Sequence, residues 1–145
     1  MIEETKYIRK EKFIDEITSF SGISADELLQ KGVLETGDFT YKEEFIDRRS
    51  VARILHNYIR IILKVKDEED ITKAYVLKDL FDCRVCANHI AQVYLKGIMN
   101  PVNIDGLIIF DVFGKVSESE LKDFLNNQIF YSAVQDFGQT IKCFG

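Results

Sequence analysis

Residues 47–65 read DRRSVARILHNYIRIILKV, which is the clearest helical pattern in the chain. Its apolar residues recur at intervals of three and four, the spacing that places side chains on one face of an α-helix. They are Val51, Ile54, Leu55, Tyr58, Ile61, Ile62 and Val65. Asp47 is suited to cap the first turn, because its carboxylate can accept hydrogen bonds from free backbone amides. We therefore predict an amphipathic helix of about four turns or more that begins at Asp47.

The other face of this helix is basic. It carries Arg49, Arg53, Arg60 and Lys64. No acidic residue lies between Asp47 and Asp67, although the whole chain has a net charge of −5. We expect Leu55 to be buried, and Arg53 and Arg60 to be exposed. A basic face of this kind can bind an anion, or it can pair with acidic neighbours such as the run 67–70.

Capping signals predict helices on both sides of this one. Residues 6–20 carry a helical apolar stripe, and Gly22 follows where a helix ends. Ser24 and Glu27 fit a capping box, which opens a short helix that ends at Gly32. Residues 33–46 contain turn-forming residues and are predicted to form a loop.

The second half of the chain repeats these signals. Asp82 is suited to cap a helix that ends at Gly97. Asp105-Gly106 is a hairpin-type turn, and we expect a short strand over residues 107–110. Ser117 and Glu120 form a second capping box. That box opens a helix predicted to reach Phe137 or Gly138.

Composition limits the classes of protein. The chain has 145 residues, of which 46% are hydrophobic and 30% charged, so we predict one globular domain over 1–145. No apolar run is long enough to insert in a membrane. An isoelectric point near 5.1 argues against nucleic-acid binding. The charged N-terminus lacks the apolar core of a secretory signal, which predicts a cytoplasmic location, or the cell surface if the chain is a piece of an exported protein.

The sequence contains an internal repeat. Residues 29–34 read LQKGVL, and residues 94–99 read YLKGIM, 65 positions later. An apolar residue and an N-cap then precede the next helix in both halves, at Ile46-Asp47 and at Val116-Ser117. Each unit therefore has a short helix, Lys-Gly, two apolar residues, a loop and a capped helix. Repeats of this kind bury their core by packing against one another.

This order resembles the S-layer homology domain, over residues 20–63 and 79–127. The resemblance implies a mainly α fold: a pseudo-symmetric helical bundle of two helix-loop-helix units, with at most short β pieces in the loops. It also implies binding of an anionic cell-wall glycan, in which the arginine after the N-cap contacts the ligand. Arg48 takes that place in the first unit, and Arg49 and Arg53 follow it on the basic helix. Glu118 takes it in the second unit and would repel an anion.

The spacing Cys83-x-x-Cys86-x-x-His89 suggests a different chemistry. These residue types bind zinc, and Cys143 would be the fourth ligand. On a regular helix, however, the outer two are about 9 Å apart along the axis and point in different directions, which disfavours convergence on one ion. A thiol–disulfide centre is the second hypothesis, since a helix N-terminus favours thiolate. The third is that Cys86 packs in the core as a reduced cysteine, because three cysteines are too few for a disulfide framework.

The sequence favours a non-catalytic binding module without a cofactor. It contains no glycine-rich phosphate loop, and no nucleophile can be assigned beside His56 or His89. The predicted partner is an anionic glycan or another protein. Five aromatic residues in the C-terminal third are expected to be mostly core, with an exposed patch that supports a homodimer as the alternative. They are Phe110, Phe113, Phe124, Phe130 and Phe137. The remaining alternatives are a metal- or thiol-dependent protein and a module that serves assembly alone.

Overall fold

The helix predicted from residues 47–65 is the central helix of the computed structural model. It comprises α3 (Arg48–Asn57) and a π-helical turn over Tyr58–Ile62. The Asp47 carboxylate accepts a hydrogen bond from the Ser50 amide, as an N-cap does. Leu55 is buried and Arg60 is exposed, which confirms those two predictions. Arg53 is half-buried, so its predicted exposure is wrong.

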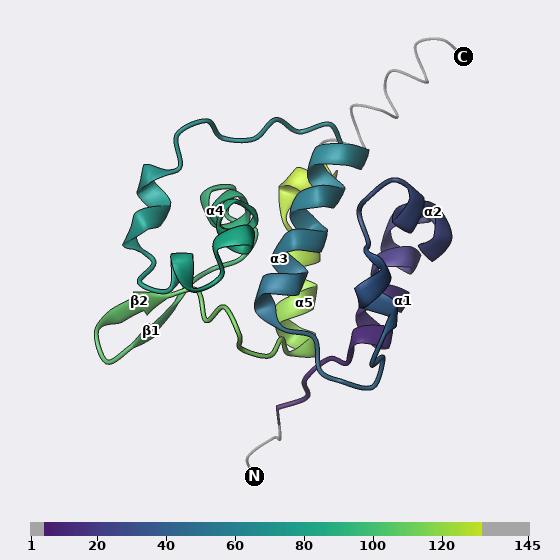
Figure 1. Ribbon diagram of the computed structural model, residues 1–145, viewed down its shortest axis with the longest axis horizontal. Helices are drawn as coiled ribbons and strands as arrows, with labels where there is room; N and C mark the ends of the chain where they lie inside the picture. The colour runs from purple at the N-terminus through teal and green to yellow at the C-terminus, as the bar shows by residue number, and fades with distance from the viewer. Residues whose placement is uncertain (1–4, 132–145) are drawn as a thin grey trace.

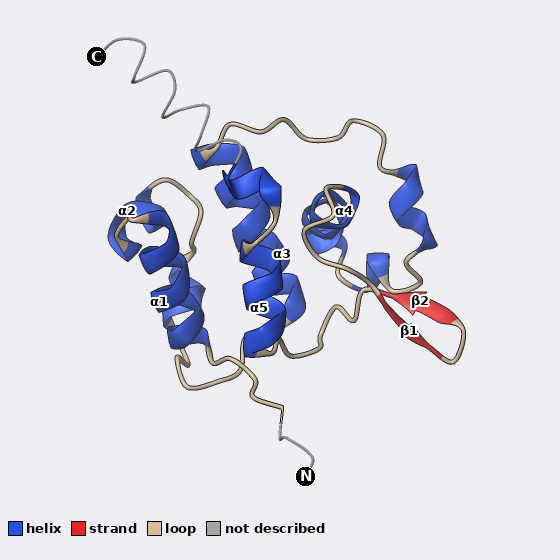
Figure 2. Cartoon of the chain, turned by 180° about the vertical axis from the view of Figure 1, so that it is seen from behind, coloured by secondary structure: helices blue, strands red, loops and turns tan. Residues whose placement is uncertain are grey.

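The structure describes residues 5–131, and this part of the chain is mainly helical, as predicted. The other α-helices are α1 (Lys10–Ser21), α2 (Ala25–Gln30), α4 (Ala87–Leu95) and α5 (Glu118–Leu125). Figures 1 and 2 show α3 and α5 in the middle, between the pair α1–α2 and the pair formed by α4 and the hairpin. Gly22, Gly32 and Gly97 follow three of these helices in the left-handed conformation that glycine adopts without strain.

Two helix predictions need correction. The helix predicted from Asp82 begins only at Ala87, because residues 80–86 form two short 3-10 turns separated by the extended backbone of Cys83. The helix predicted from Ser117 begins there, with the reciprocal capping box formed with Glu120, but α5 ends at Leu125. Asn127 then accepts a hydrogen bond from the Ile129 amide and starts a new turn. The predicted end at Phe137 or Gly138 lies outside the described residues.

The turn at Asp105-Gly106 forms the predicted hairpin. Both residues have positive φ angles, 53° and 83°, which is the conformation of a tight two-residue hairpin turn. The turn joins β1 (Val102–Ile104) to β2 (Leu107–Ile109) in antiparallel register, so the strand ends one residue earlier than predicted. The hairpin projects from the side of the molecule next to α4 (Figure 2).

Three short extended segments meet at the N-terminal ends of α1, α3 and α5. Residues 7–9, 45–47 and 115–117 lead into these helices, and we call them the lead-in segments. Each forms an isolated antiparallel bridge with both of the others: Arg9 with Phe45, Asp47 with Lys115, and Ser117 with Tyr7. The central residues of the three segments are buried, namely Ile8, Ile46 and Val116. The pairings therefore close a ring that joins parts of the chain distant in sequence.

One hydrophobic core runs through the described residues. It includes the matched helix positions predicted to share a core, Val51 with Leu121 and Ile54 with Phe124. Phe110 and Phe130 are also buried, whereas Phe113 is 58% exposed, and Phe137 lies outside the described residues. None of the helices described is long and apolar enough to cross a membrane.

Candidate functional site

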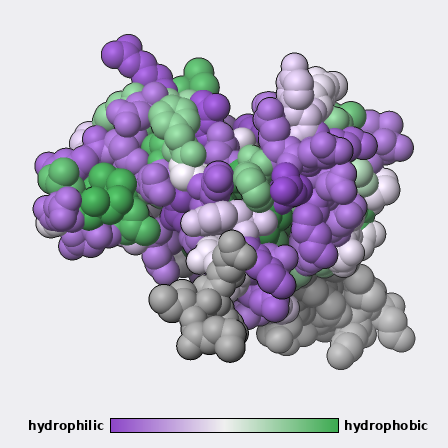
Figure 3. Space-filling model, turned by 90° about the horizontal axis from the view of Figure 1, so that it is seen from below, coloured by the Kyte–Doolittle hydropathy of each residue, from purple (hydrophilic) through white to green (hydrophobic). Residues whose placement is uncertain are grey.

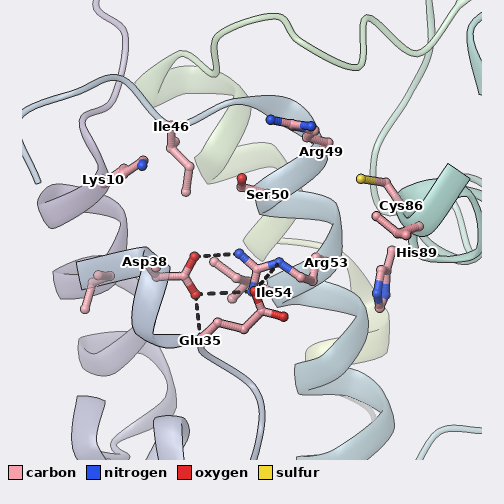
Figure 4. A pocket seen from close by; sticks show the side chains of 13 residues that line it. Lys10, Glu35, Asp38, Ile46, Arg49, Ser50, Arg53, Ile54, Cys86 and His89 are labelled. Atoms are coloured by element: carbon pink, nitrogen blue, oxygen red, sulfur yellow. Dashed lines mark hydrogen bonds and ion pairs between the residues drawn. The ribbon is translucent and has the colours of Figure 1, made fainter. Parts of the chain in front are cut away.

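A groove of about 360 Å³ lies beside the first two turns of α3. Its walls come from the start of α1, the 3-10 turn Thr36–Phe39 with the residue before it, and α3 with Ile46. The 3-10 turn Arg84–Cys86 and the start of α4 complete them. The side chains labelled in Figure 4 are Lys10, Glu35, Asp38, Ile46, Arg49, Ser50, Arg53, Ile54, Cys86 and His89. The volume is in the range of small-molecule sites, and the lining combines cations, carboxylates and apolar side chains.

Arg53 and Asp38 form a two-point ion pair in this groove. Both terminal guanidinium nitrogens of Arg53 donate to the Asp38 carboxylate, at 3.2 and 2.5 Å, and the two side chains are only 15% and 12% exposed. Asp38 also accepts from the Glu35 amide at 2.7 Å, and Glu35 lies 3.8 Å from Arg53. Arg53, which the sequence predicted as a ligand-binding residue, therefore lies at the groove, but its charge is matched by Asp38.

Arg49 lies at the rim of the groove and is 40% exposed. Its Nε donates to Asp47 at 3.0 Å, and its guanidinium carbon is 4.8 Å from the centre of the Phe113 ring. These two contacts orient the side chain, and its Nη1 lies 4.0 Å from the sulfur of Cys83. Figure 4 shows Arg49 with Ser50 between it and Lys10.

Arg48, which the sequence predicted as a ligand-binding residue, does not line the groove. Arg48 is only 2% exposed. Its Nε donates to the Phe110 carbonyl at 2.7 Å, its Nη2 donates to the Asn100 carbonyl at 2.8 Å, and its Nη1 pairs with Glu120. The guanidinium therefore holds the loop before α5 against α3. Glu118, which takes the matching place in the second half, is exposed.

Cys83 and Cys86 are joined by a disulfide bond. The expectation that Cys86 packs in the core as a reduced cysteine is therefore wrong. Cys83 is 8% exposed, and Cys86 is half-buried at the groove. The sulfurs bond to each other while the His89 ring contacts His56, so these three side chains do not converge on one point. Cys143, the fourth ligand predicted, lies outside the described residues. Within residues 5–131, no group of three or more potential metal ligands is close enough to hold an ion.

The two histidines of the chain are in contact, although they are 33 residues apart. The Nδ1 atoms of His56 and His89 lie 2.7 Å apart, and the Nε2 of His56 lies 2.6 Å from the Asp67 carboxylate. One Nδ1 must donate and the other accept, so the proton position depends on the tautomers. The result is a hydrogen-bonded chain from half-buried Asp67, through buried His56, to His89 at the groove.

This environment shifts two pKa values downward. Burial, together with charge repulsion from His56 and Arg53, lowers the pKa of His89 from 6.5 to about 4. His89 is therefore neutral at neutral pH. Burial raises the pKa of Asp67, but the hydrogen bond and charge of His56 outweigh it, so the net shift of the Asp67 pKa is downward.

Sequence reasoning missed most of the groove wall. Lys10, Glu35 and Asp38 come from segments for which no site was predicted, and only the fold brings them to α3. One feature of the sequence could have indicated that His56 contacts His89. They are the two histidines of the chain, and each lies on a predicted amphipathic helix. No family model, curated protein or solved structure matches this chain.

Proposed function

We propose that this chain is a non-catalytic binding module built from S-layer-homology-like units, and that its groove binds a glycan carrying carboxylate groups. The observation that carries the proposal is the lining of the groove. Lys10 and Arg49 offer cationic donors, while the Glu35 side chain, which is 64% exposed, offers acceptors within the same 360 Å³. Sugar hydroxyls need both donors and acceptors, and a sugar carboxylate needs a cation.

The hydrogen bonds that end the short helices support the repeat. After α2, the amides of Val33 and Leu34 donate to the Leu28 carbonyl at 2.9 and 3.2 Å. After α4, the amides of Ile98 and Met99 donate to the Val93 carbonyl at 2.9 and 3.3 Å. The donors and acceptor of the second set lie 65 positions after those of the first, the same offset as the LQKGVL and YLKGIM motifs. Matching backbone bonds at matching motifs favour two related units.

The lead-in segments extend this argument to α1. The amides of Lys10, Arg48 and Glu118, which are the first residues of α1, α3 and α5, donate across the ring to Glu44, Gly114 and Lys6, at 2.8, 2.8 and 3.0 Å. In each case the donor lies two residues after the buried central residue of its own segment. The acceptor lies two residues before the buried central residue of a different segment. We infer that α1 takes the place of the capped helix of a third unit.

Titration of a carboxylate-bearing glycan tests the binding proposal. The probe is a hyaluronan tetrasaccharide, and the control ligand is the neutral chitin tetrasaccharide. We expect the first to bind and the second to bind at least about tenfold more weakly, with affinity falling as salt rises, because exposed charges are screened. Isothermal titration calorimetry measures both affinities.

The matched variants are Arg49→Ala and Arg60→Ala. Arg49 lines the groove, whereas Arg60 is exposed on the same helix outside it. We expect Arg49→Ala to weaken binding about tenfold, the effect of losing one charge-assisted contact, and Arg60→Ala and Glu118→Ala to leave it unchanged. Equal losses from Arg49→Ala and Glu118→Ala would contradict a single site in this groove.

A module that serves assembly alone is the second candidate. Val102, Ile104 and Leu107 of the hairpin are 36%, 51% and 52% exposed. Figure 3 shows apolar surface gathered on the side of the molecule that carries the hairpin. If neither glycan binds, and analytical ultracentrifugation shows a dimer that Ile104→Lys dissociates, this second function replaces the first.

A further inference from the structure

We propose that Cys83 and Cys86 form a dithiol–disulfide exchange site, which carboxylate-bearing thiols such as glutathione reach through the groove. This activity goes beyond glycan binding and does not depend on it. The bonded pair spans the 3-10 turn Arg84–Cys86, directly before the first residue of α4. Cys86 lines the groove together with Val85, which is 87% exposed.

The two sulfur positions differ in a way that sets the direction of attack. Cys86 is half-buried and lines the groove, so an incoming thiolate can approach it. Cys83 is 8% exposed and is not part of the groove wall. Its sulfur lies 4.0 Å from Nη1 of Arg49. A guanidinium at this position stabilises a thiolate, so it favours Cys83 as the leaving group when Cys86 is attacked.

An external thiol is the reductant in this exchange and supplies both electrons. A thiolate attacks the Cys86 sulfur, the electron pair of the broken S–S bond goes to Cys83, and a mixed disulfide with Cys86 forms. A second thiolate then attacks the external sulfur of the mixed disulfide and releases the Cys86 thiolate, which takes up a proton. Two thiols are oxidised to one disulfide, and two electrons pass to the cysteine pair. The reverse sequence oxidises a thiol partner.

The groove also indicates which thiols are preferred. Apart from the Arg53–Asp38 ion pair, its charged lining is Lys10 and Arg49 against Glu35, so a thiol with carboxylates is attracted to the sulfur pair. Glutathione carries two carboxylates, whereas cysteamine is a small cation. We therefore expect glutathione to reduce the pair faster than cysteamine does when the two are compared at equal thiolate concentration.

The test uses the full chain with Cys143→Ser, so that only Cys83 and Cys86 can react. The oxidised protein is treated with glutathione or dithiothreitol without denaturant, quenched with iodoacetamide, and read by peptide mass spectrometry. We expect dithiothreitol to reduce the pair, and the trapped glutathione adduct to lie on Cys86. A pair that is reduced only in denaturant, or an adduct on Cys83, overturns the proposal.

Variants at Arg49 separate a chemical role from a structural one. Arg49→Gln should slow reduction by dithiothreitol, which has no carboxylate for Arg49 to attract, about threefold to tenfold, because the leaving thiolate loses its cation. Arg49→Lys should restore most of the rate, and the matched control Arg60→Gln should stay within about twofold. Circular dichroism checks that each variant is folded. A rate unchanged in folded Arg49→Gln overturns the assignment of Cys83 as the leaving group. No glycan is present, so this result is independent of the proposed binding function.

Discussion

The contact between His56 and His89 couples the groove to pH at the level of single residues. Asp67 and His89 both have pKa values below their ordinary ones, and His56 bonds to both of them. A downward shift for a histidine means that the folded state disfavours its protonation. The same shift for a carboxyl group means that the folded state favours its charge. Both effects make the folded protein less stable in acid.

The first prediction is that the free energy of unfolding decreases as the pH is lowered from about 6.5 to about 4. In this window the unfolded chain protonates His89, while the folded protein, in which the pKa of His89 is about 4, does not. The contribution of Asp67 is present above its ordinary pKa of 3.8 and is lost below it. Urea denaturation at several pH values measures the change.

A His89→Gln variant is the control for this prediction. Glutamine does not titrate, so the loss of stability between about pH 6.5 and pH 4 should be smaller than in the unmodified chain. An identical pH dependence in both proteins would show that His89 is not the group responsible.

Three arginines of α3 lie in different surroundings. The sequence placed Arg48, Arg49 and Arg53 in a single binding set. Neighbours on a helix point about 100° apart, so Arg48 and Arg49 face different surroundings. The partners of Arg48 are Asn100, Phe110 and Glu120, which are 52 to 72 residues away. Local patterns carry no information on such distant contacts, so the burial of Arg48 could not be predicted.

Local chemistry predicted where most helices begin. Ser24, Asp47 and Ser117 each accept a hydrogen bond from the amide three residues later, as predicted from the sequence. The prediction failed at residues 80–86, where the disulfide and two 3-10 turns replace the first turns of the expected helix. Capping and periodicity describe regular helices, and a covalent link between two side chains lies outside what they can predict.

The second prediction concerns the apolar face of α3. Leu55 is 0% exposed, so Leu55→Ala should lower the free energy of unfolding by about 2–5 kcal/mol, through lost burial and the cavity that remains. Arg60→Ala, on the exposed face, should change it by less than about 0.5 kcal/mol. Chemical denaturation of both variants measures the difference. A loss below about 0.5 kcal/mol for Leu55→Ala would place this leucine outside the core.

The lead-in segments make distant parts of the chain depend on one another. The Ile8 amide donates to the Val116 carbonyl at 2.8 Å, and the Ile46 amide donates to the Ile8 carbonyl at 3.0 Å. Ile8 is thus bonded to both other segments and is itself buried. Opening the ring at Ile8 should therefore affect α5 as well as α1, although these helices are about 100 residues apart.

The third prediction is that Ile8→Ala lowers amide protection in α1, α3 and α5 by the same amount as it lowers global stability, about 2–5 kcal/mol. If the ring joins the three helices in one cooperative unit, their slowest amides exchange only when the whole unit unfolds. Ile104→Ala, on the exposed hairpin, is the matched control and should leave this protection unchanged. Native-state hydrogen exchange measures all three helices in one experiment. A loss of protection confined to α1 would show that α1 unfolds by itself and that the ring does not couple the helices.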